Sequence, residues 1–187
     1  KFVVQCAGTM GRVQNVETMI EAAEILSNHR SIHFLFVGNG AKKRWMESKV
    51  ASLGLTNVTL LPHRPRSEQS DFLNACDVSM ISLMSGMSGV AVPSRMYNVM
   101  AAGRPIIAIA DEDTELAMTV REHEIGWVTP PGDAKALAKA VMDACLDKEK
   151  TARMGSTARR LAEEKHSRQE ITRAYMSIVR PLIFPEG

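Results

Sequence analysis

Residues 2–27, FVVQCAGTMGRVQNVETMIEAAEILS, join a short apolar run, a turn with two glycines and a longer amphipathic segment. The run Phe2–Ala7 predicts a buried β-strand, and the i, i+3, i+4 spacing of apolar residues predicts a helix over Val13–Ser27. The same alternation recurs along the chain, which is typical of a parallel sheet with helices on both faces. We therefore predict an α/β fold, a Rossmann-like doubly wound parallel sheet of about six strands with C-terminal helices.

The remaining elements follow from the same two patterns. Further strands are expected at His33–Val37, Val58–Leu61, Val78–Ile81, Pro105–Ile109 and Gly126–Val128. Further helices are expected at Ala41–Leu53, Glu68–Ala75, Ser94–Ala102, Glu115–Glu122 and Ala134–Ala144, with two or three more up to about Val179. The final residues 180–187, RPLIFPEG, hold two prolines and are expected to form an extended tail. No linker or repeat divides the chain, so we expect one domain over residues 1–187.

Composition narrows the class of protein. The 23 Lys and Arg residues stand against 21 Asp and Glu residues and are spread along the chain, which gives no indication of nucleic-acid binding. The three cysteines are far apart in sequence and fit neither a disulfide framework nor a metal-ligand spacing, so a cytoplasmic protein is expected. Because the first residues already read as a strand, we expect the chain to be part of a longer protein whose upstream half is missing.

Three glycine-containing turns follow strands and lead into helices, where ligands of open α/β sheets bind. In the turn Gly8–Arg12, backbone amides and the Arg12 side chain are candidates for holding a diphosphate, although a plain connecting turn explains two glycines as well. The turn Gly38–Gly40 follows the second strand. Residues 84–95, MSGMSGVAVPSR, form a loop of small and apolar residues that feeds a helix start, so a ligand can approach the backbone closely.

The acidic run Asp111–Asp113 follows the fifth strand without His or Cys nearby, so an ordinary turn is the expectation there and no metal site is predicted.

Residues 92–108, VPSRMYNVMAAGRPIIA, resemble the donor-site segment of the glycogen-synthase-like retaining GT-B glycosyltransferases, in the subgroup that builds bacterial surface polysaccharides. Three further segments occur in the order and spacing of that family: AGTMGRVQNVETMIEAAEIL at 7–26, FLFVGNGAKKRWMESKVASLGLTNVTLLPHRPRSE at 34–68, and FLNACDVSMISL at 72–83. The resemblance implies that this chain is the C-terminal, donor-binding half of such an enzyme.

The resemblance also implies roles for particular positions. Gln14 stands where many relatives carry a lysine, and Ser88 and Asn98 stand at the places of two family glutamates. Catalytic residues are not identified, and neither a metal nor a cofactor is expected. The residues expected to bind the donor diphosphate are Gly8, Thr9, Met10, Gly11, Arg12, Gln14, Gly89, Val90, Ala91, Val92 and Arg95; those expected near the ribose and sugar are Ser88, Ser94 and Asn98; those expected near the base are Gly38, Asn39, Pro62, His63 and Arg64.

By resemblance, the full-length protein transfers a sugar from a nucleotide-diphosphate donor, with UDP favoured, to a saccharide or lipid-linked acceptor. This chain is expected to bind the donor and to carry out no transfer without the N-terminal acceptor-binding domain. Contact of the full-length protein with the inner face of a membrane stays open. Two alternatives remain: half of a UDP-sugar epimerase with the same architecture, and a non-catalytic nucleotide-binding α/β domain.

Overall fold

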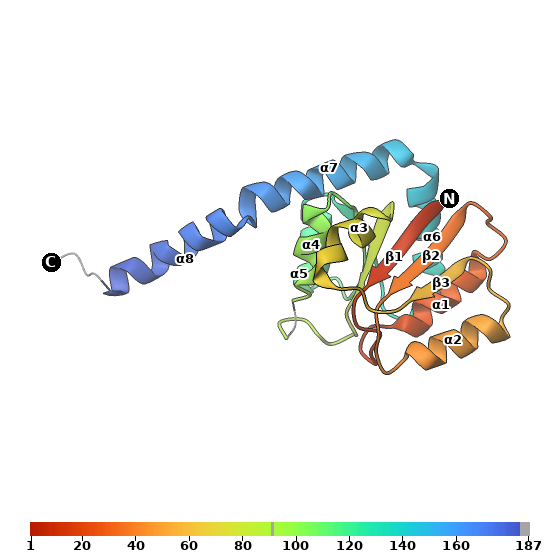
Figure 1. Ribbon diagram of the computed structural model, residues 1–187. Helices are drawn as coiled ribbons and strands as arrows, with labels where there is room; N and C mark the ends of the chain where they lie inside the picture. Colours follow the sequence, from red (N-terminus) through yellow and green to blue (C-terminus); the bar gives the residue numbers. More distant parts are fainter. Residues whose placement is uncertain (91, 184–187) are drawn as a thin grey trace.

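The computed structural model describes residues 1–90 and 92–183. Its centre is a six-stranded parallel sheet in the order β3-β2-β1-β4-β5-β6 (Figure 1). The doubly wound sheet expected from the sequence is confirmed, and the observed strands differ from the expected ones by a residue at one end or not at all. They are β1 (Phe2–Ala7), β2 (Ile32–Val37), β3 (Val58–Leu61), β4 (Val78–Ser82), β5 (Ile106–Ile109) and β6 (Gly126–Thr129).

Helices cover both faces of this sheet and enclose two apolar clusters. One face carries α1 (Val16–Ile25), α2 (Lys43–Ser52) and α6 (Ala134–Leu146). The other carries α3 (Gln69–Asn74, after the short 3₁₀ helix η1, Arg66–Glu68), α4 (Arg95–Ala101) and α5 (Glu115–Glu122), with α7 (Lys148–Lys165) lying across α4.

Strand β5 shows why the sheet needs both layers. Ile107 and Ile109 belong to one apolar cluster, whereas Ile106 and Ala108 belong to the other, as the alternation of side chains along a strand requires. All of these side chains are fully buried. Burying an Ile side chain stabilises the fold by about 1.5–3 kcal/mol, so the continuous apolar run Ile106–Ile109 fixes β5 in the interior of the sheet.

Helix α1 begins at Val16, so the expected start at Val13 was wrong. Asn15 precedes the helix in the left-handed conformation with φ 46°, which Asn tolerates better than most residues. Its side-chain amide donates hydrogen bonds of 3.0 Å to the Ser82 hydroxyl and to the Leu83 carbonyl. These bonds hold residues 11–15 as a turn over the end of β4, and the glycine turn therefore does not run directly into a helix.

The expected extended tail was wrong for residues 180–183, which form the last part of α8 (Arg168–Ile183). The amphipathic period of this segment prevails over the helix-breaking tendency on which the expectation rested. Residues 184–187 lie outside the described residues. Helix α8 projects from the body of the molecule (Figure 1). Its side chains Ile171, Tyr175, Ile178 and Leu182 are exposed, and their spacing places them on one face of the helix.

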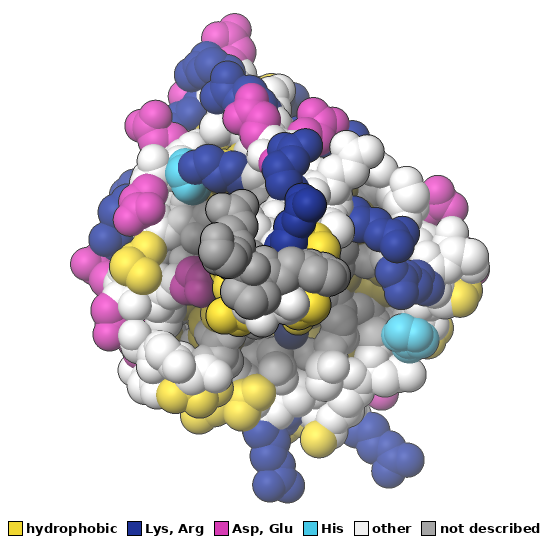
Figure 2. Space-filling model, turned by 90° about the vertical axis from the view of Figure 1, so that its left-hand side faces the viewer, with side chains coloured by type: hydrophobic (Ala, Val, Ile, Leu, Met, Phe, Trp, Pro, Cys, Tyr) yellow, Lys and Arg dark blue, Asp and Glu magenta, His cyan; other side chains and the backbone are white. Residues whose placement is uncertain are grey.

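Seen from the side of α8, Lys and Arg side chains are intermixed with Asp and Glu over the upper part of the molecule (Figure 2). This mixed pattern agrees with the nearly balanced charge of the sequence, a net +2. No helix among the described residues combines the length and apolar character needed to cross a membrane.

Gly38 gives a direct test of the packing at the carboxyl ends of β1 and β2. A Cβ atom added there would lie 1.9 Å from the Gly8 carbonyl oxygen, whereas one added at Gly132 would meet no atom within 4 Å. Both glycines have positive φ, 152° and 80° respectively. We expect Gly38→Ala to lower the free energy of unfolding by about 1–3 kcal/mol more than Gly132→Ala, because only the first adds a backbone clash. Urea unfolding curves measure the difference, and equal losses would contradict the packing described.

Candidate functional site

The site lies at the carboxyl ends of the strands, where the strand order reverses between β1 and β4. The chain leaves β1 toward β2 on one side, and leaves β4 toward β5 on the other. The two connections diverge there, and this crevice is where doubly wound sheets bind ligands. Asn15 links the loop after β1 to the end of β4 through the bonds to Ser82 and Leu83 described above.

Two turns pack tightly on one edge of the crevice. Gly38 is buried against the Gly8 carbonyl, and a Cβ atom at Gly40 would lie 2.3 Å from the Met10 carbonyl oxygen. The Gly8 amide donates to the Val37 carbonyl at 2.8 Å, and the Met10 amide donates to the Asn39 carbonyl at 2.9 Å. Only residues without a side chain allow this approach, so the glycines set the shape of the edge.

The amide of Gly11 is also engaged inside the protein. It donates to the Gln14 side-chain oxygen at 2.9 Å. The amides of Gly8, Met10 and Gly11, which the sequence offered as diphosphate donors, are therefore already hydrogen-bonded to other protein groups.

Arg95, the first residue of α4, lies over Gly8. Its Nη1 nitrogen would be 3.3 Å from a Cβ atom added at Gly8. This nitrogen is buried and has no hydrogen-bond partner among the residues that the structure describes. An unsatisfied buried donor destabilises a protein by about 1–3 kcal/mol, and by more when it is charged, so an anion beside Arg95 would offset that loss.

Cys6, below Arg95 in β1, supplies no such anion. Burial raises the pKa of its thiol, and the positive charge of Arg95 only partly opposes that shift. The thiol therefore stays neutral near pH 7.

Arg95 lines two neighbouring pockets. Pocket A, about 190 Å³, has Gly8 and Val37 on its sheet side and His63 and Arg64 after β3. Its α4 side is formed by Arg95 and Asn98. The Arg64 guanidinium lies 3.7 Å from the Glu68 carboxylate, an exposed pair that holds the side chain only weakly.

Pocket B, about 260 Å³, lies on the other side of Arg95. The loop after β1 contributes Val13 and Gln14, and the loop after β4 contributes Met84, Met87 and Val92. The segment Pro93–Arg95 closes it. A molecule with an anionic centre at Arg95 can therefore place one end in each pocket.

Asp111, at the end of β5, fixes the loop beside pocket B. Its carboxylate accepts hydrogen bonds from the Ser85 hydroxyl, at 2.8 and 3.0 Å, and from the Gly86 amide at 2.8 Å. The Ser88 hydroxyl donates to the Asp113 carbonyl at 3.0 Å. Thr114 completes the turn as the N-cap of α5, accepting from the Ala117 amide at 3.2 Å and donating to the Asp111 carbonyl at 2.7 Å.

The structure brings together only part of the expected set. Gly8, His63, Arg64, Arg95 and Asn98 line pocket A, and Gln14, Val92, Ser94 and Arg95 line pocket B. The remaining described positions line neither pocket: Met10 and Gly38 are buried, Ser88 is bonded to Asp113, Gly11 is half-buried, and Thr9, Arg12, Asn39, Pro62, Gly89 and Val90 are exposed. Ala91 lies outside the described residues.

Sequence reasoning missed two residues that shape the site. Asn15 was predicted to lie within a helix, but it precedes α1 in the left-handed conformation. Asn adopts this conformation in turns more readily than most residues, so its presence just before a helix could have indicated the turn. Asp111 was assigned to an ordinary turn, and only the fold shows that its carboxylate reaches a loop 26 residues earlier in the chain.

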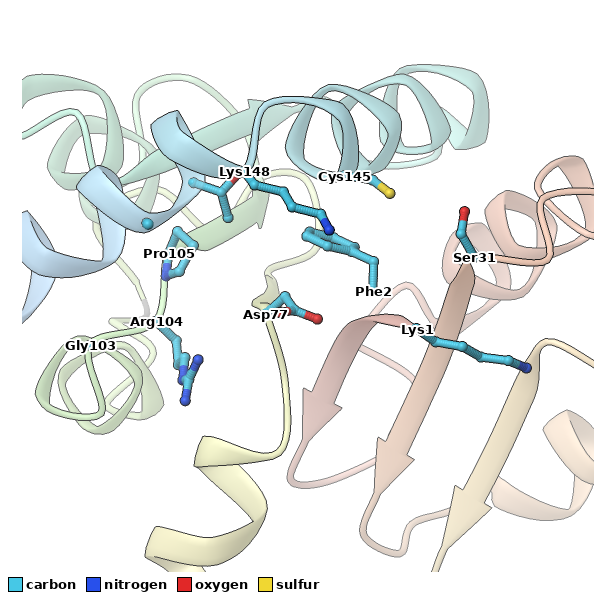
Figure 3. Close-up of a pocket in the computed structure, with 11 residues that line it drawn as sticks. Lys1, Phe2, Ser31, Asp77, Gly103, Arg104, Pro105, Cys145 and Lys148 are labelled. Atoms are coloured by element: carbon cyan, nitrogen blue, oxygen red, sulfur yellow. The ribbon is translucent and has the colours of Figure 1, made fainter.

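A further pocket of about 460 Å³ opens at the opposite end of the sheet, near the amino ends of β1 and β2 (Figure 3). Two of its four charged lining residues, Asp77 and Arg104, are hydrogen-bonded within the fold, although the Arg104 Nε is, like Arg95 Nη1, buried without a hydrogen-bond partner among the described residues. The Asp77 carboxylate accepts from the Val3 amide at 2.7 Å, and an Arg104 Nη donates to the Asn74 carbonyl at 3.0 Å. Because parallel sheets bind ligands at the carboxyl ends of strands, pockets A and B are the better candidates.

Among the described residues, His, Cys, Asp and Glu side chains form no group of three that could hold a metal ion.

The family model described as glycosyl transferases group 1 matches residues 1–161. The chain belongs to this glycosyltransferase family. WbjE of Pseudomonas aeruginosa, named a probable glycosyltransferase, is 33% identical over 98% of this chain and 45% of its own length. The family resemblance expected from the four sequence segments is thus confirmed, and the chain spans less than half the length of that relative.

Two solved structures have the same fold. Sucrose-phosphate synthase from Thermosynechococcus elongatus superposes with a TM-score of 0.83 at 22% identity, over 100% of this chain and 46% of that one. HepE from Anabaena, solved in complex with UDP, superposes with a TM-score of 0.77 at 21% identity, over 95% of this chain and 49% of that one. The chain thus has the fold of the C-terminal domain of a GT-B enzyme.

The Asp111 bonds predict how the loop at pocket B responds to mutation. Asp111→Ala removes the acceptor of the Ser85 hydroxyl and the Gly86 amide, so amide hydrogen exchange over residues 84–90 should become faster by about tenfold, as expected for losing one charged hydrogen bond. Asp113→Ala is the matched control, because Ser88 bonds to the backbone carbonyl of that residue and not to its carboxylate. Equal exchange in the two variants would show that Asp111 does not hold the loop.

Proposed function

We propose that this chain binds the nucleotide-diphosphate sugar, with UDP as the favoured nucleotide, of a retaining glycosyltransferase that builds a polysaccharide or glycolipid. The diphosphate lies at Arg95, the base and ribose extend into pocket A, and the sugar extends into pocket B. The proposal assigns no cofactor and no metal to the chain, and it treats the UDP-sugar as a substrate.

The buried Nη1 of Arg95 carries the proposal. It is a cationic donor without a protein partner, held against Gly8 between the two pockets. An Arg guanidinium offers two parallel donors to phosphate oxygens, a geometry suited to a diphosphate. The short helix α4 contributes by holding this side chain and Asn98, rather than by its own dipole.

Arg95 can compensate for the positive charge that is absent at Gln14. The family resemblance implies that many relatives carry a lysine here, which would be a second cation near the phosphates. Gln14 is neutral and accepts a hydrogen bond from the Gly11 amide. Stabilisation of the departing diphosphate would then rest on Arg95 to a greater degree.

The family membership and the UDP complex of the HepE structure support a UDP-sugar donor. They also favour a transferase over the epimerase and non-catalytic alternatives. The surface-polysaccharide subgroup, the cytoplasmic location and a lipid-linked or saccharide acceptor rest on the sequence resemblance.

We place the acceptor site in a separate N-terminal half of the full-length protein, because relatives are about twice as long as this chain. In this proposal the chain alone binds the donor and transfers no sugar. Contact with the inner face of a membrane would then depend on the acceptor and on the other half.

Titration of the chain with UDP, followed by calorimetry, tests the proposal. We expect binding by UDP that is stronger than binding by GDP or ADP. Arg95→Ala should weaken UDP binding by at least about tenfold, because a charged hydrogen bond to phosphate is lost.

Arg153→Ala is the control for nonspecific electrostatic effects, since it removes an exposed Arg of α7 that lines neither pocket. Its UDP affinity should match that of the unmodified chain. Binding of none of the nucleotides at millimolar concentration, or equal losses in the two variants, would refute a diphosphate site at Arg95.

A further inference from the structure

We infer that pocket B selects a donor sugar that carries an acetamido group, as in an N-acetylhexosamine, over the corresponding plain hexose. This inference rests on the proposed function, which puts the diphosphate at Arg95. It concerns the sugar of the donor, which would lie in pocket B when the diphosphate is at Arg95.

The position of the sugar follows from Arg95. Pocket A lies on the side of β2 and β3, and pocket B lies on the side of the loop after β4. In a nucleotide-diphosphate sugar the diphosphate separates the nucleoside from the sugar. With the diphosphate at Arg95 and the nucleoside in pocket A, the sugar lies in pocket B.

Pocket B has a mixed lining. Of its ten described lining residues, six are apolar (Val13, Leu83, Met84, Met87, Val92 and Pro93) and four are polar (Gln14, Ser82, Ser94 and Arg95). Val13, Met84 and Val92 are 47%, 39% and 47% exposed, and Met87 is half-buried beside them. Of the described residues that line the pocket, none carries a carboxylate. A methyl group of the ligand would cover these apolar side chains, whereas a hexose surrounded by hydroxyls would leave them facing polar groups.

Two polar side chains of the neighbouring loops, Asp111 and Ser88, are already hydrogen-bonded within the protein, whereas Ser82 and Ser94 belong to the lining of pocket B. The Asp111 carboxylate accepts from Ser85 and Gly86, and the Ser88 hydroxyl donates to the Asp113 carbonyl. Ser88 occupies the place of a family glutamate by resemblance, so the carboxylate that would accept from a sugar hydroxyl is replaced by a group that is already bonded.

Gln14 supplies a hydrogen-bond donor for the carbonyl of the acetamido group. Its oxygen accepts from the Gly11 amide at 2.9 Å, and this fixes which end of the side-chain amide is the oxygen. The Gln14 nitrogen, which can only donate, belongs to the same pocket-lining side chain. An acetamido group offers both a carbonyl acceptor for this nitrogen and a methyl group for the apolar side chains.

The test compares two probes that differ only at C2 of the sugar, UDP-N-acetylglucosamine and UDP-glucose, with UDP as the reference. We expect the chain to bind the acetamido sugar about three- to tenfold more tightly than UDP-glucose, the factor that one neutral hydrogen bond contributes. Calorimetric titration measures the ratio of the two affinities.

Two variants dissect the ratio. Gln14→Glu keeps an acceptor for the Gly11 amide and removes the donor, and Met84→Gln makes one apolar wall polar at similar length. Each should bring the ratio closer to one. Met176→Gln, the same replacement at a 47% exposed methionine of α8, should leave the ratio unchanged.

The outcomes separate the two proposals. If UDP binds but UDP-glucose binds as tightly as UDP-N-acetylglucosamine, the acetamido selection is wrong and the donor site stands. If UDP does not bind, both fail. If the ratio is high but neither Gln14→Glu nor Met84→Gln lowers it, pocket B is not the sugar site.

Discussion

The site depends on the contact between two backbones at Gly8 and Gly38. A side chain at Gly38 would collide with the Gly8 carbonyl, and a side chain at Gly8 would approach the Arg95 guanidinium. Without these glycines the turns after β1 and β2 would separate, and Arg95 would lose the surface against which it is held. The close approach of Gly8 and Gly38 therefore helps to determine where the Arg95 guanidinium lies.

The Arg95 Nη1 nitrogen has no hydrogen-bond partner among the described residues, and several other groups of the candidate site are bonded elsewhere or uncharged. The amides of Gly8 and Gly11 bond within the protein, Cys6 stays neutral, and Asp111 bonds to the loop after β4. A buried donor without a partner lowers the stability of a fold, and an anion bound beside Arg95 would offset such a loss. Sites that perform binding often show this local loss, because groups arranged for a ligand are poorly arranged for each other.

The sheet could be predicted well from the sequence, because a continuous apolar run such as Ile106–Ile109 is typical of a strand that is buried on both faces. Through the family resemblance the sequence also named Arg95, which lines both candidate pockets, among the residues expected to bind the donor. It missed Asn15 and Asp111, whose roles depend on partners 67 and 26 residues away in the chain. Local sequence patterns do not reveal contacts between such distant residues. The bonds of the Gly8 and Met10 amides to Val37 and Asn39 could not be predicted for the same reason.

A crystal structure of the chain with UDP would show directly whether Arg95 holds the diphosphate. We expect a phosphate oxygen within hydrogen-bonding distance of Arg95 Nη1, with the uracil in pocket A near His63 and Arg64. A diphosphate bound away from Arg95, for example at the amino-terminal edge beside Arg104, would contradict it.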